Sequence, residues 1–421
     1  MCQWSIAAGH NRRPEGQGPE GTPAAGLPRR AANRRMDRWS RTGEAGLETR
    51  CRRGRPPQNR LLLYGLVLVT CCGVVTAQTS GFDALAAQAN EARESDRLDE
   101  AVVLYRKALA LRPAWAEGWW YMGTLLYDRD DYAGAASALR KAVELSPQSG
   151  NAFAMLGLSE AKLGRDGDAL QHLEKGRRLG VGGDESLRRV LLYTQGTLLL
   201  SAGEFSKAQE ALDLLARSSA DQEELMDALG ESVLGIRPGD LASADSATQE
   251  VVRRAGRAEH VAARGDVHAA LAEYGRLAAS APKVHNIQFA YGRFLLANHF
   301  DGQAVEAFRR EIGNSPQHLL ARLGIAGILA ETDPAAGLPY AEQAVRLAPG
   351  LAEAHYLLGM LLLGTGAVEK AIFELETAQH KDPADPRVYF ALGRAYTQAH
   401  RMEDAARARA EFARLSKENP K

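Results

Sequence analysis

The sequence predicts an all-α fold in which short antiparallel helix pairs stack into an α-solenoid. Three observations favour this fold. Prolines recur about every 34 residues, small and large residues recur in step with them, and every strongly periodic segment has the apolar spacing of a helix. Alanine and leucine dominate, and short glycine-containing breaks recur at nearly regular intervals, as expected for paired helices.

The prolines define the period. Three pairs of them have the same separation along the chain: Pro113 and Pro147, Pro282 and Pro316, and Pro349 and Pro383. Proline lacks a backbone N–H and clashes with the preceding helical turn, so it ends the second helix of each unit. The period therefore corresponds to one helix pair per unit.

Residues of fixed size keep the same period. A small residue falls in the second helix at Ala101, Ala135, Ala169, Ala208, Ala270, Ala304, Ala371 and Ala405, and a large apolar residue follows four positions later at Tyr105, Leu139, Leu173, Leu212, Tyr274, Phe308 and Leu375. Six first helices carry a glycine, at Gly123, Gly157, Gly196, Gly292, Gly359 and Gly393. We expect helices to approach closely at the small residues and the large residue to fill the gap beside them, so that stacked units share a continuous core.

This combined spacing resembles that of the tetratricopeptide-repeat (TPR) family over almost all of residues 82–419. The resemblance implies a right-handed superhelix of stacked antiparallel helix pairs, with a concave groove that binds a protein or peptide. Nine units are predicted, at residues 82–115, 116–149, 150–183, 189–222, 251–284, 285–318, 319–351, 352–385 and 386–419.

The register shifts at two places. Five residues, 184–188, are inserted before the fourth unit, after a glycine-rich segment that we expect to end a helix. The seventh unit lacks one residue near Asp333 and Pro334.

A third break divides the array. Residues 223–236 predict one further helix, but its partner helix is replaced by residues 237–248, which lack an apolar stripe and are expected to be an irregular linker. The linker would separate an N-terminal stack, residues 82–236, from a C-terminal stack, residues 249–419. It is either a surface loop that interrupts packing or a binding loop.

The N-terminal segment differs from the repeats. Residues 1–59 are rich in Arg, Pro and Gly without hydrophobic periodicity, so we expect them to be disordered, and Met36 is an alternative start. Residues 1–60 hold thirteen Arg and five acidic residues, a net charge of +8, so the neutral chain carries −8 after residue 77. An acidic body argues against nucleic-acid binding, which needs a clustered basic face.

Residues 61–77, LLLYGLVLVTCCGVVTA, form an apolar run after several arginines. Small residues end the run, so we expect a signal peptide at residues 60–77, cleavage after Ala77 and a periplasmic or secreted protein. The alternatives are an uncleaved membrane anchor, with the repeats outside the cytoplasm, and a lipid-modified Cys71. All four cysteines precede residue 78, which excludes disulfides, Cys-ligated zinc and a thiol nucleophile from the exported chain.

No catalytic or cofactor motif interrupts the repeats. The sequence has no HExxH, no GxSxG, no phosphate-binding glycine loop and no kinase signature, and no segment remains for a separate catalytic domain. The nine histidines after residue 78 are scattered without metal-ligand spacing: His172, His260, His268, His285, His299, His318, His355, His380 and His400. We therefore expect no enzyme activity, no cofactor and no metal site.

The resemblance also implies which residues face the groove, namely positions 2, 5, 9 and 12 of each unit. The fifth position is aromatic in five of the nine units, at Trp120, Tyr193, Phe289, Tyr356 and Phe390, and other groove positions hold Asn90, Tyr127, Asn151, Arg293 and Arg394. Rigid rings among amide and guanidinium groups are typical of a peptide-binding surface. The same rings can instead fill the interior of the superhelix.

These expectations predict a non-catalytic scaffold or adaptor for a peptide or protein whose identity the sequence does not give. The alternative is a non-catalytic structural or regulatory subunit of an envelope enzyme complex. One subtype is argued against, because the Lys and Asn clamp of chaperone-binding TPR proteins is absent from the first three units, where Ala86 stands in place of the first Lys.

Overall fold

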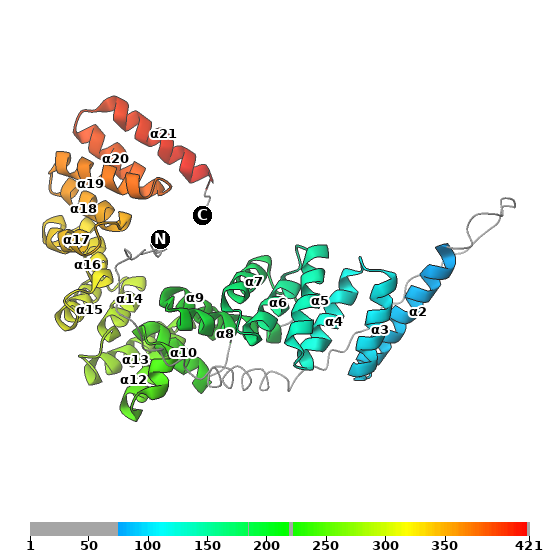
Figure 1. The fold of residues 1–421 in the computed structure, drawn as a ribbon. Coiled ribbons are helices and arrows are strands. Elements are labelled where there is room, and N and C mark those ends of the chain that lie inside the picture. Colours follow the sequence, from blue (N-terminus) through cyan, green and yellow to red (C-terminus); the bar gives the residue numbers. More distant parts are fainter. Residues whose placement is uncertain (1–74, 184, 219–221, 419–421) are drawn as a thin grey trace, which may run out of the picture. The chain divides into compact units, whose positions relative to one another are not determined.

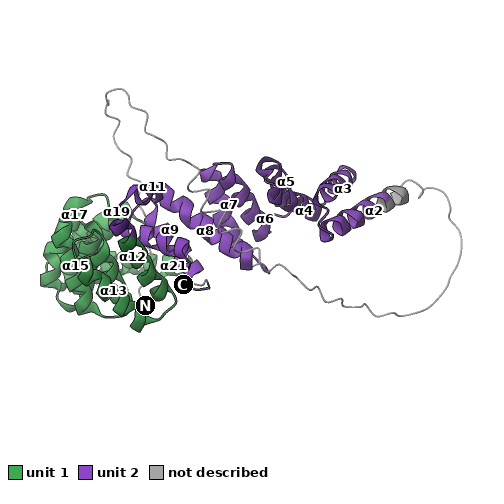
Figure 2. Cartoon of the chain, turned by 90° about the horizontal axis from the view of Figure 1, so that it is seen from below, with its two compact units in different colours: residues 1–25, 250–421 green, residues 26–249 purple. Residues whose placement is uncertain are grey.

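The computed structural model describes residues 75–183, 185–218 and 222–418. These residues form 20 α-helices, α2 to α21, and the described ranges contain no β-strand (Figure 1). The chain divides between Gln249 and Glu250 into two compact units, which are coloured separately in Figure 2. The predicted all-α solenoid of stacked helix pairs is confirmed.

The unit before residue 250 contains four helix pairs and two further helices. The pairs are α2 (Val75–Glu94) with α3 (Leu98–Leu111), α4 (Ala116–Asp128) with α5 (Tyr132–Leu145), α6 (Gly150–Lys162) with α7 (Asp166–Leu179), and α8 (Glu185–Ala202) with α9 (Phe205–Ala216). The further helices are α10 (Glu223–Leu234), as predicted for residues 223–236, and the short α11 (Pro238–Ser243).

The unit after residue 249 is built from five pairs. They are α12 (Ser246–Ala263) with α13 (Val267–Ser280), α14 (Ile287–Ala297) with α15 (Asp301–Asn314), α16 (Leu319–Thr332) with α17 (Pro334–Leu347), α18 (Ala352–Gly364) with α19 (Val368–Lys381), and α20 (Pro386–Gln398) with α21 (Met402–Glu418). Each of the nine predicted units is therefore one helix pair.

The expectation that residues 237–248 are irregular is wrong for most of that segment. Residues 238–243 form α11, and α12 begins at Ser246. Pro238 occupies the first turn of α11, where its missing N–H costs nothing, and Leu241 is buried. Asp245 then accepts a hydrogen bond from the Thr248 backbone N–H at 2.7 Å and caps α12. One buried leucine and two favourable helix N-termini are therefore enough to make most of this segment helical, even without an apolar stripe.

In most helix pairs, a residue with left-handed backbone conformation connects the two helices. These residues, with φ between 56° and 82°, are Asp96, Asp130, Gly164, Gly203, Gly265, His299, Gly366 and His400. Among the described pairs, α16 and α17 have no such residue between them, because Asp333 caps α17 directly and Pro334 begins it. This is the consequence of the residue that the seventh unit lacks.

The glycines mark the closest contacts within pairs. A Cβ atom at Gly123 would lie 2.6 Å from Leu139 Cγ, and one at Gly359 would lie 2.6 Å from Leu375 Cγ. The same contact, always at the same separation along the chain, joins Gly157 to Leu173, Gly196 to Leu212 and Gly292 to Phe308. The large partners are buried, so the predicted close approach is confirmed.

Several first helices of each compact unit contact one another directly. α4 contacts α6 and α6 contacts α8 in one unit, while α16 contacts α18 and α18 contacts α20 in the other. The second helices share no contacts of comparable extent among the described residues. Where they are in contact, these first helices approach one another more closely than the second helices do.

No helix in the described ranges is both long enough and apolar enough to cross a membrane. The predicted disordered segment 1–59 lies outside the described residues. So does most of the predicted signal peptide or anchor at 60–77, of which only residues 75–77 are described, at the start of α2.

Candidate functional site

Two predicted groove residues have structural partners. The Asn90 side-chain oxygen accepts a hydrogen bond from the Tyr105 hydroxyl at 2.5 Å, and burial raises the pKa of Tyr105 to about 12. The Asn151 amide donates to the Gly182 carbonyl at 3.2 Å and accepts from the Gly182 N–H at 3.0 Å. Both asparagines therefore hold helices and loops in place, which leaves less of each side chain for a ligand.

The aromatic residues of the unit before residue 250 differ in exposure. Trp120 and Tyr127 on α4 are partly exposed, and the Tyr127 ring packs edge-on against Tyr132 with centroids 5.3 Å apart. Tyr193 on α8 is only 1% exposed, so the prediction that its ring faces a ligand is wrong. The helix that carries it, α8, contacts α6, α7, α9, α10 and α11.

Phe289 is also a core residue rather than a surface anchor. Its side chain is 9% exposed, and its ring lies 5.8 Å from that of Phe308 and 4.6 Å from that of His318. Arg293, one turn later on α14, is exposed, with its guanidinium 6.0 Å from the Phe289 ring centroid. Of these two side chains, only that of the arginine is exposed.

Three predicted residues come together on the first helices α18 and α20. With Arg387, which the sequence reasoning missed, they form what we call the α18–α20 strip: Tyr356, Arg387, Phe390 and Arg394. The Arg387 guanidinium lies 5.1 Å from the Tyr356 ring centroid and thereby joins the two helices. Residues 387, 390 and 394 lie on one face of α20, because successive members are three and four positions apart.

Arg387 is neutralised within the strip. Its guanidinium lies 2.7 Å from the Asp385 carboxylate and 2.6 Å from that of Glu353. Burial opposes its charge, but the bonds to Asp385 and Glu353 outweigh burial and raise the pKa of Arg387. Three of the four hydrogen bonds of the Arg387 guanidinium go to Asp385 and one goes to Glu353. Arg387 therefore stabilises the charge of Glu353 only in part, and burial raises the pKa of Glu353.

Phe390 and Arg394 are the open part of the strip. Phe390 is 53% exposed, with its ring 5.5 Å from that of Phe412 on α21. Arg394 is exposed and forms neither a hydrogen bond nor an ion pair with any described residue. A large apolar ring thus lies one turn from a cation that no described side chain neutralises.

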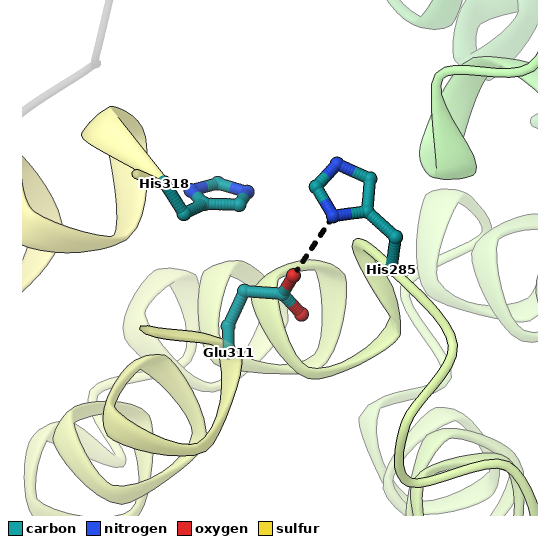
Figure 3. Close-up of side chains that lie close together, drawn as sticks. All are labelled: His285, Glu311 and His318. Atoms are coloured by element: carbon teal, nitrogen blue, oxygen red, sulfur yellow. Dashed lines mark ion pairs between the residues drawn. The ribbon is translucent and has the colours of Figure 1, made fainter. Parts of the chain in front are cut away.

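A cluster of ligand-type side chains lies elsewhere in the same unit. His285, Glu311 and His318 each offer one atom, and these atoms lie within 4.8 Å of one another (Figure 3). The expectation of scattered histidines is therefore wrong for this pair. No sequence motif marks the cluster, since the two histidines are about one repeat apart and only the stacking of α14, α15 and α16 brings them together.

Two family models match the chain, both described as "Tetratricopeptide repeat". One matches residues 86–150, 121–180 and 256–318, and the other matches residues 329–392. Together these ranges cover more than half of the 421 residues. No curated protein sequence matches the chain.

Solved structures that match the chain include a fragment of MamA from Desulfovibrio magneticus RS-1 and Tom70 from yeast. The MamA fragment is 22% identical, with a TM-score of 0.39, and the match covers 41% of this chain and 98% of that one. Tom70 is 14% identical, with a TM-score of 0.33, over 81% of this chain and 85% of that one.

Proposed function

Because this chain belongs to the tetratricopeptide-repeat family, we propose that it is a non-catalytic scaffold that binds a protein or peptide along its first helices. The observation that carries the proposal is the open end of the α18–α20 strip, where Phe390 is exposed and Arg394 has no partner among the described residues. Interface hot spots are enriched in aromatic residues and arginine, which supports this assignment.

The chemistry of the strip suggests the kind of partner. A guanidinium binds a carboxylate through two parallel hydrogen bonds, and the Phe390 ring beside it favours an apolar side chain. Arg387 is already neutralised by Asp385 and Glu353, so the strip offers one free positive charge rather than a basic patch. The preferred partner is a peptide segment with an Asp, a Glu or a terminal carboxylate next to a large apolar residue.

A peptide array tests this function. We expect the full-length chain to bind peptides that combine an acidic and a large apolar residue. The Phe390→Ala and Arg394→Ala variants should each lose about 1–3 kcal/mol of affinity for the selected peptides, the usual cost of truncating an interface anchor. Fluorescence titrations measure the loss.

The chain offers matched controls for both variants. Phe373 on the second helix α19 is 66% exposed, and Arg346 on α17 is exposed. Phe373→Ala and Arg346→Ala should leave peptide affinity unchanged. Equal losses in the control variants, or no loss in Phe390→Ala and Arg394→Ala, would contradict the assignment of the binding surface.

We also propose that the repeats act outside the cytoplasm. The apolar run at residues 61–77, with arginines before it and small residues at its end, supports export. N-terminal sequencing of the exported protein is the test.

A further inference from the structure

We propose that His285, Glu311 and His318 bind one zinc ion, which ties the start of α14, the end of α15 and the start of α16 together. Two imidazole nitrogens and one carboxylate oxygen are a ligand set that zinc favours, with water at the fourth position. The side chains converge from three separate segments. Figure 3 shows the His285 ring directed toward the Glu311 carboxylate and one edge of the His318 ring directed into the same space.

The distances suit a tetrahedral ion. His285 Nδ1 lies 3.4 Å from Glu311 Oε1. Two ligands bonded to zinc at its usual bond lengths are separated by about 3.4 Å along a tetrahedral edge. The His318 atom lies within 4.8 Å of both others, and His285 is largely exposed, so rotation of its side chain can close the remaining gap.

Glu311 is unusual for its position. Its side chain is completely buried. Glu311 is the residue whose carbonyl accepts the hydrogen bond from the C-cap N–H of its helix. In six other second helices, the residue at this position is small or apolar. Those residues are Ala108, Ala142, Gly176, Leu277, Ala344 and Ala378. In α9 the position holds Asp213, which is only half-buried. A buried carboxylate is expensive unless it is compensated, and a bound cation compensates it directly.

The hydrogen bonds that Glu311 accepts occupy only part of its capacity as an acceptor. Its Oε1 accepts from the Asn286 N–H at 3.0 Å and from the Ser315 hydroxyl at 3.1 Å, and its Oε2 accepts from the Phe289 N–H at 3.3 Å. A carboxylate has about four acceptor sites, so one remains for a metal even with these bonds in place. The cap on α14 and a metal ligand are compatible roles.

Zinc binding requires an unprotonated nitrogen on each histidine ring. His285 Nδ1 lies 2.6 Å from the Ser315 hydroxyl. Because the His285 side chain is exposed, its ring can carry the proton on Nε2 and leave Nδ1 free to bind the metal. His318 Nδ1 accepts from the Ala321 N–H at 3.1 Å and caps α16, while Nε2 lies 2.9 Å from the Asn286 side-chain oxygen. Coordination through Nε2 moves the proton to Nδ1, so the metal must replace both the cap on α16 and the hydrogen bond to Asn286. The lost cap alone lowers the affinity by about tenfold.

The test is calorimetric titration of Zn²⁺ alone into the full-length chain, freed of metal with a chelator, with its thiols alkylated and without a histidine tag. We expect one saturable site per chain. A hundredfold excess of Zn²⁺ over its Kd should raise the Tm by about 5 °C or more, because the ion binds only the folded chain.

Three variants assign the site. His285→Ala removes an exposed ligand, and His318→Asn removes the imidazole but keeps a good N-cap residue on α16, so both should fold. Each should weaken Zn²⁺ binding at least tenfold, whereas His380→Ala, which changes an exposed histidine of α19, should bind as the wild type does. Absence of saturable binding in the wild type, or wild-type affinity in either His285→Ala or His318→Asn, overturns the proposal.

Discussion

At the scale of single residues, the contacts between a glycine and a large apolar side chain follow directly from the repeat, but the last pair lacks this contact. In the last pair, the position that corresponds to the large apolar partner of the glycine holds Arg409, which faces Gly393. A Cβ atom at Gly393 would lie 3.3 Å from Arg409 Cγ, and the guanidinium donates to the Thr397 hydroxyl at 2.7 Å. The aliphatic part of Arg409 therefore lies beside Gly393, where the other pairs have a large apolar side chain, while its charged end reaches Thr397.

Buried polar residues also join neighbouring pairs. Glu160 on α6 is 1% exposed and lies 2.8 Å from Arg140 on α5 and 2.5 Å from His172 on α7. Burial alone would raise the pKa of Glu160, but the hydrogen bonds from His172 and Arg140 outweigh it and lower the pKa. The ionised carboxylate is therefore stabilised in the folded state.

This shift predicts a pH-dependent contribution to stability. Because the pKa of Glu160 is lower in the folded than in the unfolded chain, its contribution is present above the unfolded value, 4.5, and is lost as the pH falls through the folded value. Glu160→Gln should cost about 1–3 kcal/mol at pH 7, and the difference from the wild type should shrink below about pH 4.5. Urea unfolding at pH 7 and pH 3.5 measures both.

Glu144→Gln is the matched control, since Glu144 forms an exposed ion pair with Lys141 on the same helix. It should change the free energy of unfolding by less than about 0.5 kcal/mol at either pH. An equal cost for Glu160→Gln at both pH values would show that Glu160 contributes through packing rather than through its charge.

At the scale of elements, four first helices share a contact that the sequence does not reveal. Their fourth residue donates to the carbonyl of the proline six positions earlier, which ends the preceding unit: Trp119 to Pro113 at 2.8 Å, Arg322 to Pro316 at 2.5 Å, His355 to Pro349 at 3.1 Å and Tyr389 to Pro383 at 3.0 Å. Four chemically different side chains satisfy the same carbonyl, so no residue type marks the position. The bond fixes the turn between units.

Tyr389→Phe tests the strength of this contact, because it removes only the hydroxyl. We expect a loss of about 0.5–1.5 kcal/mol, the net value of one hydrogen bond. Tyr291→Phe is the control, since the Tyr291 hydroxyl forms no hydrogen bond with a described residue. Chemical denaturation compares the two variants, and equal stabilities would mean that the turn does not depend on the bond.

At the scale of the whole chain, contacts are local. The helices that touch are mostly neighbours or two apart along the chain, and α8 with α11 is the widest contact of comparable extent among the described residues. Each pair therefore depends on the pairs beside it, as in other repeat proteins. The proposed binding strip on α18 and α20 and the proposed metal site at α14 to α16 lie on different parts of this stack.

The proposed export concerns the chain as a whole and gives a further prediction. Cleavage after Ala77 would produce a mature N-terminus at Gln78, because small residues at the end of an apolar run direct signal peptidase to that bond. N-terminal sequencing of the exported protein should find Gln78. Recovery of the intact apolar segment in the membrane fraction would instead indicate an anchor.

The sequence by itself determined the helix pairs, their number and their close contacts. Each of these depends on local periodicity, and the spacing of glycine, alanine and proline records it directly, as the Gly123 to Leu139 contact illustrates. The helix α11 is the exception, because a sequence-based analysis does not predict it. It is too short to produce a periodic pattern, and only one buried leucine and a proline at its start favour it.

Only the tertiary structure decided which side chains are available for binding. Tyr193 and Phe390 occupy the same position of their units, yet one is 1% and the other 53% exposed. Burial depends on the neighbouring helices, and no residue's own sequence context reports them. For the same reason His285 and His318, about one repeat apart, meet at Glu311 only because stacking brings the ends of one unit together.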